Sequence, residues 1–214
     1  MLDFVVMPLG ILGANCYIVY DKYKSAAIID PGGNIETVKR RVEDLGVNIE
    51  SIILTHGHFD HIFAALDLAQ YYSANIIAGK NEKVLLNDAE LNLTAKFARK
   101  PLSFDADIYV GDGDEVTVGK ITLSVIETPG HTPGGISLYT KGYVFTGDTL
   151  FASSIGRTDF AFGDARMLAD SLKNRLFRLP GKTVVLPGHG EQTTISNEKK
   201  VNYAAQDVIT AYKV

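Results

Sequence analysis

Short hydrophobic runs separated by polar and glycine-rich segments recur along the chain. Runs rich in Val, Ile and Tyr and bounded by Gly, Pro, Asn or Asp are typical of β-strands. The pattern predicts strands at residues 2–7, 16–21, 26–29, 51–54, 74–78, 108–110, 115–118, 120–127, 136–140, 143–146 and 183–186. Because only short turns separate the first three strands, we expect them to form a meander.

Apolar residues at helical spacing predict helices at residues 35–45, 62–72, 165–178 and 196–212. The charged run at 198–200, Glu-Lys-Lys, is predicted to lie on an exposed face of the last helix. Residues 80–103 show no clear period and predict an exposed excursion, of the kind that often covers a neighbouring site.

The alternation of strands and helices predicts an α/β fold. The order of strands, helix, strands, helix occurs twice, roughly either side of residue 105. Two such halves could stack sheet against sheet as a four-layer αββα sandwich of two mixed sheets flanked by helices, although periodicity alone supports only a mixed α/β fold. The length fits one domain over residues 1–214.

Composition narrows the classes of partner. The net charge is −4 and the pI about 5.7, without the basic footprint of a nucleic-acid-binding protein. No window approaches the roughly 20 apolar residues that span a bilayer, and the N-terminus does not resemble a signal peptide. A single cysteine, Cys16, cannot form an intramolecular disulfide. We therefore expect a cytoplasmic protein that acts on a small-molecule substrate, with no nucleic-acid or membrane partner; the oligomeric state cannot be read from the sequence.

Candidate chemistry is concentrated directly after the predicted strand 51–54. Three of the five histidines and one aspartate lie within six residues there: His56, His58, Asp60 and His61. Imidazole nitrogens and carboxylate oxygens are ligands for zinc, and in some sites for iron or manganese. A polar loop with three histidines by chance is the simpler alternative, but it leaves this clustering unexplained.

Three further candidates follow other predicted strands in glycine-rich turns: His131, Asp148 and His189. Each alone would more often be a solvated loop residue. Together with the first cluster, they leave no histidine of the chain unused. A catalytic zinc takes three protein ligands plus water, so two such sites sharing Asp148 as a bridge would use all seven side chains.

This set of seven, in this order, resembles the metallo-β-lactamase superfamily over nearly the whole chain. The resemblance implies the αββα sandwich and two divalent ions. It places one ion on His56, His58 and His131, the other on Asp60, His61 and His189, and makes Asp148 the bridge between them.

Four shorter motifs resemble the glyoxalase II-like bacterial hydrolases: Asn15-Cys16-Tyr17, Asp30-Pro31-Gly32-Gly33, Gly147 to Phe151 and Ser154 to Asp159. That subgroup is similar to hydroxyacylglutathione hydrolases, which cleave S-lactoylglutathione to lactate and a free thiol. Only 24 residues follow Gly190 in this sequence, whereas full-length glyoxalase II carries a helical C-terminal domain that helps to hold glutathione. The resemblance therefore implies thioester hydrolysis more strongly than it implies glutathione as the thiol of the substrate.

These observations predict a thioester hydrolase in which a metal-bridging hydroxide attacks the acyl carbon. Bound metal lowers the pKa of water to about 7, so no strong separate base is needed. Asp60 would orient the nucleophile or accept its proton, and a thiolate leaves without a general acid. Zinc is the expected ion, with iron and manganese as alternatives. Arg157 either supports the site, meets a substrate carboxylate, or is a solvated surface residue.

Other functions remain open at this stage. Persulfide dioxygenases resemble the chain around residues 156–159 and hold a single iron at the counterparts of His56, His131 and Asp148. Lactonase and β-lactamase activities also occur in the superfamily, whereas no basic arm supports a nuclease. The non-catalytic alternative is a protein whose metals only stabilise the fold.

Overall fold

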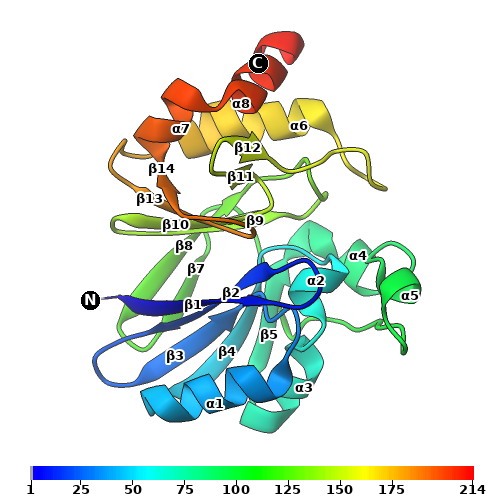
Figure 1. Ribbon diagram of the computed structural model, residues 1–214, viewed down its shortest axis with the longest axis vertical. Helices are drawn as coiled ribbons and strands as arrows, with labels where there is room; N and C mark the ends of the chain where they lie inside the picture. Colours follow the sequence, from blue (N-terminus) through cyan, green and yellow to red (C-terminus); the bar gives the residue numbers. More distant parts are fainter. Residues whose placement is uncertain (1) are drawn as a thin grey trace.

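The computed structural model describes residues 2–214, whose strands and helices form four layers (Figure 1). The strands are β1 (Asp3–Leu9), β2 (Ala14–Tyr20), β3 (Ser25–Ile29), β4 (Asn48–Leu54), β5 (Asn75–Gly79), β6 (Ile108–Val110), β7 (Glu115–Val118), β8 (Ile121–Glu127), β9 (Ile136–Thr140), β10 (Tyr143–Gly147), β11 (Leu150–Phe151), β12 (Ser154–Ile155), β13 (Val184–Pro187) and β14 (Thr193–Thr194). The helices are α1 (Ile35–Leu45), α2 (Phe59–Ile62), α3 (Ala65–Tyr72), η1 (Lys80–Glu82), α4 (Lys83–Leu86), α5 (Thr94–Phe97), α6 (Ala165–Asp170), η2 (Ser171–Arg175), η3 (Leu176–Arg178), α7 (Ile195–Val201) and α8 (Tyr203–Tyr212).

The two large sheets are both mixed. In the first, with strand order β1-β2-β3-β4-β5-β6, an antiparallel meander of three strands continues into parallel pairs. In the second, with order β14-β13-β10-β9-β8-β7, only β10 and β13 pair in parallel. This arrangement confirms the predicted αββα sandwich of two mixed sheets flanked by helices.

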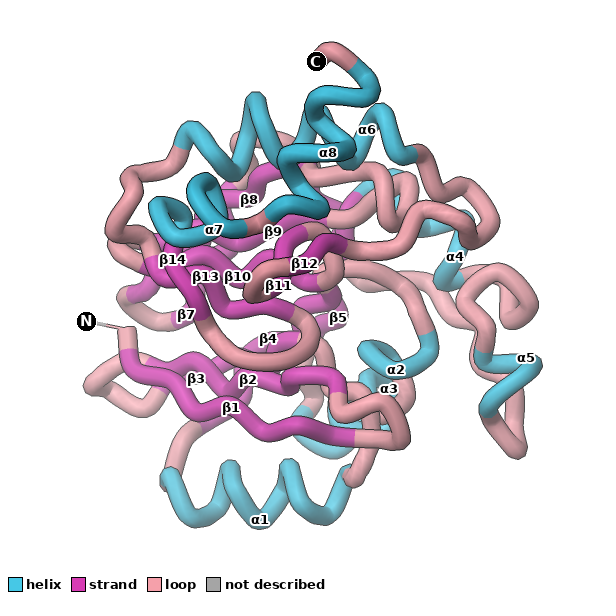
Figure 2. The backbone as a smooth tube through the Cα atoms, turned by 45° about the horizontal axis from the view of Figure 1, so that its top comes forward, coloured by secondary structure: helices cyan, strands magenta, loops and turns pink. Residues whose placement is uncertain are grey.

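Three hydrophobic clusters fill the spaces between the four layers. Val38 of α1 and Leu68 of α3 pack on the outer face of the first sheet, and Leu168 of α6 packs on the outer face of the second. Between the sheets, Ile53 of β4 and Phe145 of β10 belong to one shared cluster. Figures 1 and 2 show α1 and α3 on one side of the paired sheets and α6, α7 and α8 on the other. Both sheets are thus covered on both faces, which explains the continuous apolar runs of their strands.

Three predicted boundaries were wrong. The strand at 108–110 was assigned to the second half, but β6 pairs in parallel with β5, so the halves divide after Val110. The helix predicted at 62–72 is two helices, because the Ala64 N–H donates to Pro31 O at 2.9 Å outside the helix. The last helix is interrupted at Asn202, whose side chain caps α8 by accepting from Ala205 N at 3.0 Å.

The excursion at residues 80–103 is less exposed than predicted. Glu82, Leu85, Leu86, Asn92 and Thr94 are buried within it. Only short helices form there, and they lie beside α2 at one end of the sandwich (Figure 2). A few buried side chains therefore anchor the segment to the body of the protein, while most of its other residues are exposed or partly exposed, as predicted.

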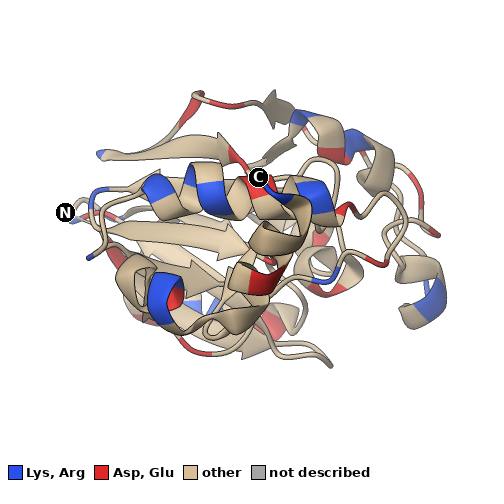
Figure 3. Ribbon diagram, turned by 90° about the horizontal axis from the view of Figure 1, so that it is seen from above, with Lys and Arg blue, Asp and Glu red and all other residues tan. Residues whose placement is uncertain are grey.

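Residues of both charge signs are spread along the ribbon in Figure 3, where Lys and Arg occur on several separate helices. In the part of the chain that the structure describes, no helix has both the length and the apolar character required to cross a membrane.

Candidate metal centre

The loops that carry the predicted ligands all follow strands. His56 lies between β4 and α2, His58 precedes the first residue of α2, and Asp60 and His61 lie in α2 itself. The other three follow β8, β10 and β13 in order: His131, Asp148 and His189. Although these segments are far apart in sequence, the fold brings all seven side chains into one cluster.

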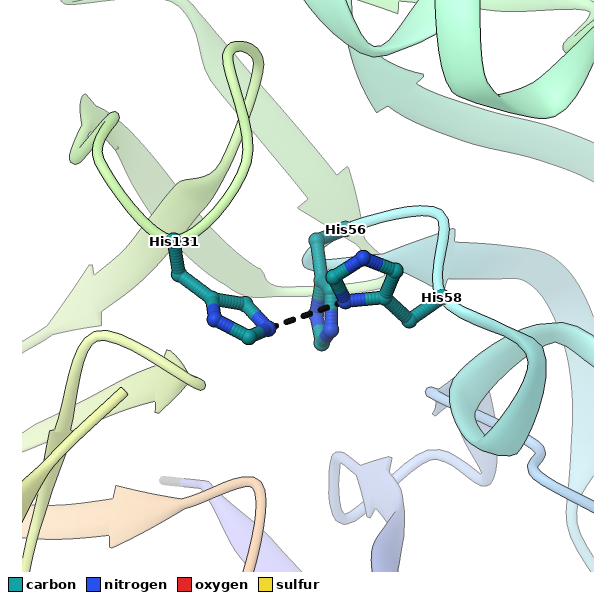
Figure 4. Close-up of side chains that lie close together, drawn as sticks. All are labelled: His56, His58 and His131. Atoms are coloured by element: carbon teal, nitrogen blue, oxygen red, sulfur yellow. Dashed lines mark hydrogen bonds between the residues drawn. The ribbon is translucent and has the colours of Figure 1, made fainter. Parts of the chain in front are cut away.

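His56, His58 and His131 form a first group. Each offers one ligand-type nitrogen, and these nitrogens all lie within 4.8 Å of one another. His58 Nδ1 is 2.9 Å from His131 Nε2, and the three imidazole rings converge from two loops (Figure 4). All three side chains are buried.

Asp60, His61 and His189 form a second group. Each offers one ligand-type atom, and these atoms also lie within 4.8 Å of one another. His189 Nε2 lies 3.2 Å from Asp60 Oδ2 and 3.3 Å from His61 Nε2. Asp148 touches both groups: its Oδ1 is 3.4 Å from His61 Nε2, and its Oδ2 is 3.6 Å from the Nε2 atoms of His131 and His189. This position suits a carboxylate that bridges two ions.

Unpaired polar atoms indicate that the cluster suits cations. Within residues 2–214, the buried atoms His56 Nε2, His58 Nε2 and Asp148 Oδ1 have no hydrogen-bond partner. Burying such atoms unpaired is costly, and most buried polar groups in proteins are paired. The donor set of imidazoles and carboxylates fits a binuclear metal centre, because two ions would pair His56 Nε2 and Asp148 Oδ1 and separate the closely spaced nitrogens.

Ionisation differs between the two groups. Burial, followed by the neighbouring His131 and His61, lowers the pKa of His58 to about 3, and burial with His61 lowers the pKa of His56 well below its usual range. Burial opposes the charge on Asp60 and His61, but their partners outweigh it. The hydrogen bond from His189 and the charge of His61 lower the pKa of Asp60 to about 2, and Asp148 and Asp30 raise the pKa of His61 to about 10. His56 and His58 are thus neutral at pH 7, whereas the carboxylate of Asp60 is ionised.

Asp30 is a supporting residue that the residue pattern did not single out. Its carboxylate accepts hydrogen bonds from Thr55 N at 2.7 Å and Thr55 Oγ1 at 2.5 Å, and lies 3.0 Å from His61 Nδ1. A carboxylate at Nδ1 fixes the ring so that Nε2 faces the cluster, as in many metal sites. One ligand-type atom each of Asp30, His56 and His61 also lies within 4.8 Å of the other two. Both Asp30 oxygens, however, already accept hydrogen bonds from Thr55. We therefore interpret Asp30 as an orienting group.

The loop that carries His189 is fixed by β2. Asn15 Nδ2 donates to Pro187 O at 3.0 Å and to Gly190 O at 2.9 Å, and Tyr17 OH donates to Pro187 O at 2.7 Å. These long-range bonds explain why Asn15 and Tyr17, noted only as part of a family-like motif, matter for the site.

Arg157 supports the cluster through its backbone. His131 Nδ1 lies 2.6 Å from Arg157 O, which directs Nε2 of the ring toward the other ligand candidates. The exposed guanidinium instead pairs with both carboxylate oxygens of Asp159, at 2.9 and 2.7 Å.

Arg157→Ala is expected to leave the metal content unchanged, because the carbonyl that meets His131 remains. Loss of the exposed ion pair should have little effect on stability, because solvent screens both charges. Elemental analysis of the purified variant and a urea unfolding curve measure both quantities. A fall in bound metal would contradict the backbone role.

A cavity of about 260 Å³ adjoins both groups. Its walls include Asp60, His131, Asp148 and His189 of the cluster, together with mostly apolar side chains from four other segments. A small molecule in this cavity would therefore contact the ligand candidates directly.

Comparison with known proteins agrees with this geometry. Residues 9–189 match the family described as the metallo-beta-lactamase superfamily. The chain belongs to this superfamily. It is 34% identical over 205 residues to hydroxyacylglutathione hydrolase GloC of Haemophilus influenzae, covering 94% of this chain and 97% of the relative.

Two solved structures are also similar to this chain. The crystal structure of the BLEG-1 B3 metallo-beta-lactamase has a TM-score of 0.89 and 36% identity, covering 94% of this chain and 99% of that one. TTHA1623, solved in a di-iron-bound form, has a TM-score of 0.84 and 32% identity, covering 92% and 98%. The protein is thus a metallo-hydrolase of this superfamily.

Proposed function

We propose that the protein hydrolyses the thioester of a small molecule, such as S-lactoylglutathione or a related acyl-thiol. The observation that carries the proposal is the pair of three-residue groups joined by Asp148 beside a cavity of about 260 Å³. Similarity to the GloC hydroxyacylglutathione hydrolase over 94% of the chain supports the substrate class.

In this proposal His56, His58 and His131 hold one divalent ion, Asp60, His61 and His189 hold the other, and Asp148 contacts both. Zinc is proposed because nitrogen and carboxylate donors suit it, although the di-iron form of TTHA1623 shows that a similar fold takes iron. Bound ions of this kind supply water with a pKa near 7 and polarise a carbonyl.

The roles of the chain's own residues follow from their ionisation. Asp60, with a pKa of about 2, is ionised at neutral pH, so we propose that it orients the attacking water rather than acting as a strong base. His58 and His131 border the cavity and would lie beside the carbonyl to be cleaved. Apart from the ligand candidates, none of the described residues that line the cavity carries an acidic side chain. A thiolate is a good leaving group that needs no such donor, so this lining is compatible with thioester cleavage.

The proposal predicts that protein loaded with about two zinc ions per chain hydrolyses at least one thioester of a panel built on glutathione and simpler thiols. Release of free thiol is measured, with chelator-treated protein as the control. Fully metallated protein without activity on the panel would contradict the proposal. One iron per chain, with oxygen uptake on glutathione persulfide, would instead favour a dioxygenase.

A further inference from the structure

We propose that the cavity beside the metal cluster selects apolar acyl groups, so that simple alkanoyl thioesters are better substrates than 2-hydroxyacyl thioesters. This inference rests on the proposed thioester hydrolysis and concerns its substrate. It comes from the walls of the cavity rather than from the ligand set.

Two phenylalanines cover the cluster from different sides. The ring of Phe160 meets His58 edge to face, with 5.1 Å between ring centroids, and lies 6.0 Å from His131. The ring of Phe151 lies 6.0 Å from His189. Both phenylalanines line the cavity, so an acyl group bound beside the cluster contacts aromatic carbon near each group of histidines.

The remaining walls are also apolar. Phe59 is buried and stacks on Phe97 of α5 with 4.3 Å between centroids, and Leu93 of the same excursion lines the cavity. Leu12 lines the rim and is 56% exposed, and its neighbour Ile11 is 71% exposed.

Apart from the metal-ligand candidates, Arg157 is the one polar side chain among the residues that line the described cavity, and Asp159 already pairs with it. A 2-hydroxyl on the acyl group would therefore meet apolar carbon or compete for a metal ligand. At about 260 Å³, the cavity is slightly smaller than typical small-molecule pockets, which suits the acyl end alone, with the thiol extending past the rim.

A matched pair of substrates tests this. S-(2-methylpropanoyl)glutathione differs from S-lactoylglutathione only by a methyl in place of the hydroxyl. We expect kcat/KM to be about 10-fold higher for the methylpropanoyl thioester, the scale on which apolar pockets discriminate such groups. Phe160→Ala should reduce this ratio, whereas Phe162→Ala, at an exposed position that does not line the cavity, should preserve it.

A ratio of one or below would contradict the apolar selection while leaving thioester hydrolysis standing. Hydrolysis of neither thioester, together with inactivity on the rest of the thioester panel, would contradict the proposed function instead. In that case calorimetric binding of the thioethers S-(2-methylpropyl)glutathione and S-(2-hydroxypropyl)glutathione still decides the selection, since it needs no turnover, and tighter binding of the hydroxylated thioether would overturn it.

A second inference rests on a different observation, the carboxylate of Glu82. Glu82 ends η1 and is fully buried. Its Oε1 accepts from Gly57 N at 2.8 Å, and its Oε2 accepts from Gly134 N at 2.9 Å and from Thr132 Oγ1 at 3.0 Å. One side chain thus connects two loops that are 75 residues apart in the sequence, at positions 57 and 132.

Those two loops carry the whole first group. Gly57 lies between His56 and His58, and Thr132 follows His131. Both glycines are needed for the approach of the Glu82 segment: a Cβ at Gly57 would lie 3.2 Å from Glu82 Oε1, and a Cβ at Gly134 would lie 2.0 Å from Glu82 N. The second group is fixed by other residues, Asp30 and Asn15.

We infer that Glu82 is a positioning residue that holds the three-histidine group in its ligand geometry and leaves the second group unaffected. Removing supporting groups of this kind typically weakens metal binding by about 10- to 100-fold. Glutamine keeps the size of the side chain, but its amide nitrogen cannot accept from a backbone N–H, so one of the two loops loses its acceptor.

The test titrates zinc alone into chelator-treated Glu82→Gln and follows binding by calorimetry. One of the two binding events should weaken by about 10- to 100-fold, namely the event that His131→Ala removes. Thr132→Val, which loses a single hydrogen bond, should weaken the same event only a few-fold and serves if Glu82→Gln does not fold.

Glu198→Gln is the matched control. Glu198 is also fully buried, and it accepts from Ser153 N at 2.8 Å and from Thr193 Oγ1 at 2.6 Å, away from both ligand loops. It should lower the melting temperature and leave both zinc affinities unchanged. Equal weakening of both events in folded Glu82→Gln, or of neither, would overturn the positioning role.

Discussion

His131→Ala is expected to lower the bound metal from about two ions to about one per chain and to reduce turnover by about 1,000-fold or more. His131 belongs to the first group, lies 2.9 Å from His58 and 3.6 Å from Asp148, and has its ring oriented by Arg157 O. Alanine removes the third ligand of that group and its link to the bridging carboxylate. The ion bound there should be lost because the two remaining histidines supply too few donors.

Elemental analysis and thiol-release assays measure the two effects, and far-UV circular dichroism checks that the variant is folded. His189→Ala provides the comparison, because it should remove the other ion. The double variant should retain neither. Two tightly bound ions in folded His131→Ala would contradict the assignment of this residue as a ligand.

Gly32→Ala is expected to destabilise the protein by more than about 4 kcal/mol and to abolish folding at ordinary temperatures. A Cβ at Gly32 would lie 1.6 Å from Asp60 O and 2.8 Å from Asp60 C, which are backbone atoms of α2. Neither backbone segment can shift to relieve this clash, because α2 contains the buried Asp60 and His61 and the loop before Gly32 contains Asp30. The clash therefore separates the first strands from the cluster.

Gly113→Ala is the control that distinguishes the effect of a steric clash from the effect of backbone strain. Gly113 has a φ of +81°, but nothing lies within 4 Å of a Cβ there. Alanine should cost only about 1 kcal/mol at this position, the price of a left-handed conformation. Urea unfolding of both variants gives the comparison, and a Gly32→Ala protein as stable as Gly113→Ala would contradict the close-packed contact.

Supporting residues were harder to anticipate than ligand candidates. Histidines and aspartates at strand ends are visible in a sequence because few other roles explain their clustering. Glu82 lies in a segment without clear periodicity, and its partners Gly57 and Gly134 contribute only backbone N–H groups. The prediction that residues 198–200 form an exposed face was wrong for Glu198, which is fully buried and hydrogen-bonded to Asn202 at 2.9 Å.

The sequence by itself determined most of the local elements of both sheets, a mixed α/β fold and the seven candidate ligands with their order along the chain. Those features depend on hydrophobic periodicity and on residue type, both of which are local. The grouping of the ligand candidates, which the sequence implied only through its resemblance to a family, has its geometry in the tertiary structure. Only the tertiary structure decided that β6 joins the first sheet, and that Asp30, Glu82 and the Arg157 carbonyl orient the cluster. These contacts join segments that lie tens of residues apart in the sequence. They are made by backbone atoms and by single buried carboxylates, and neither produces a recognisable pattern in the sequence.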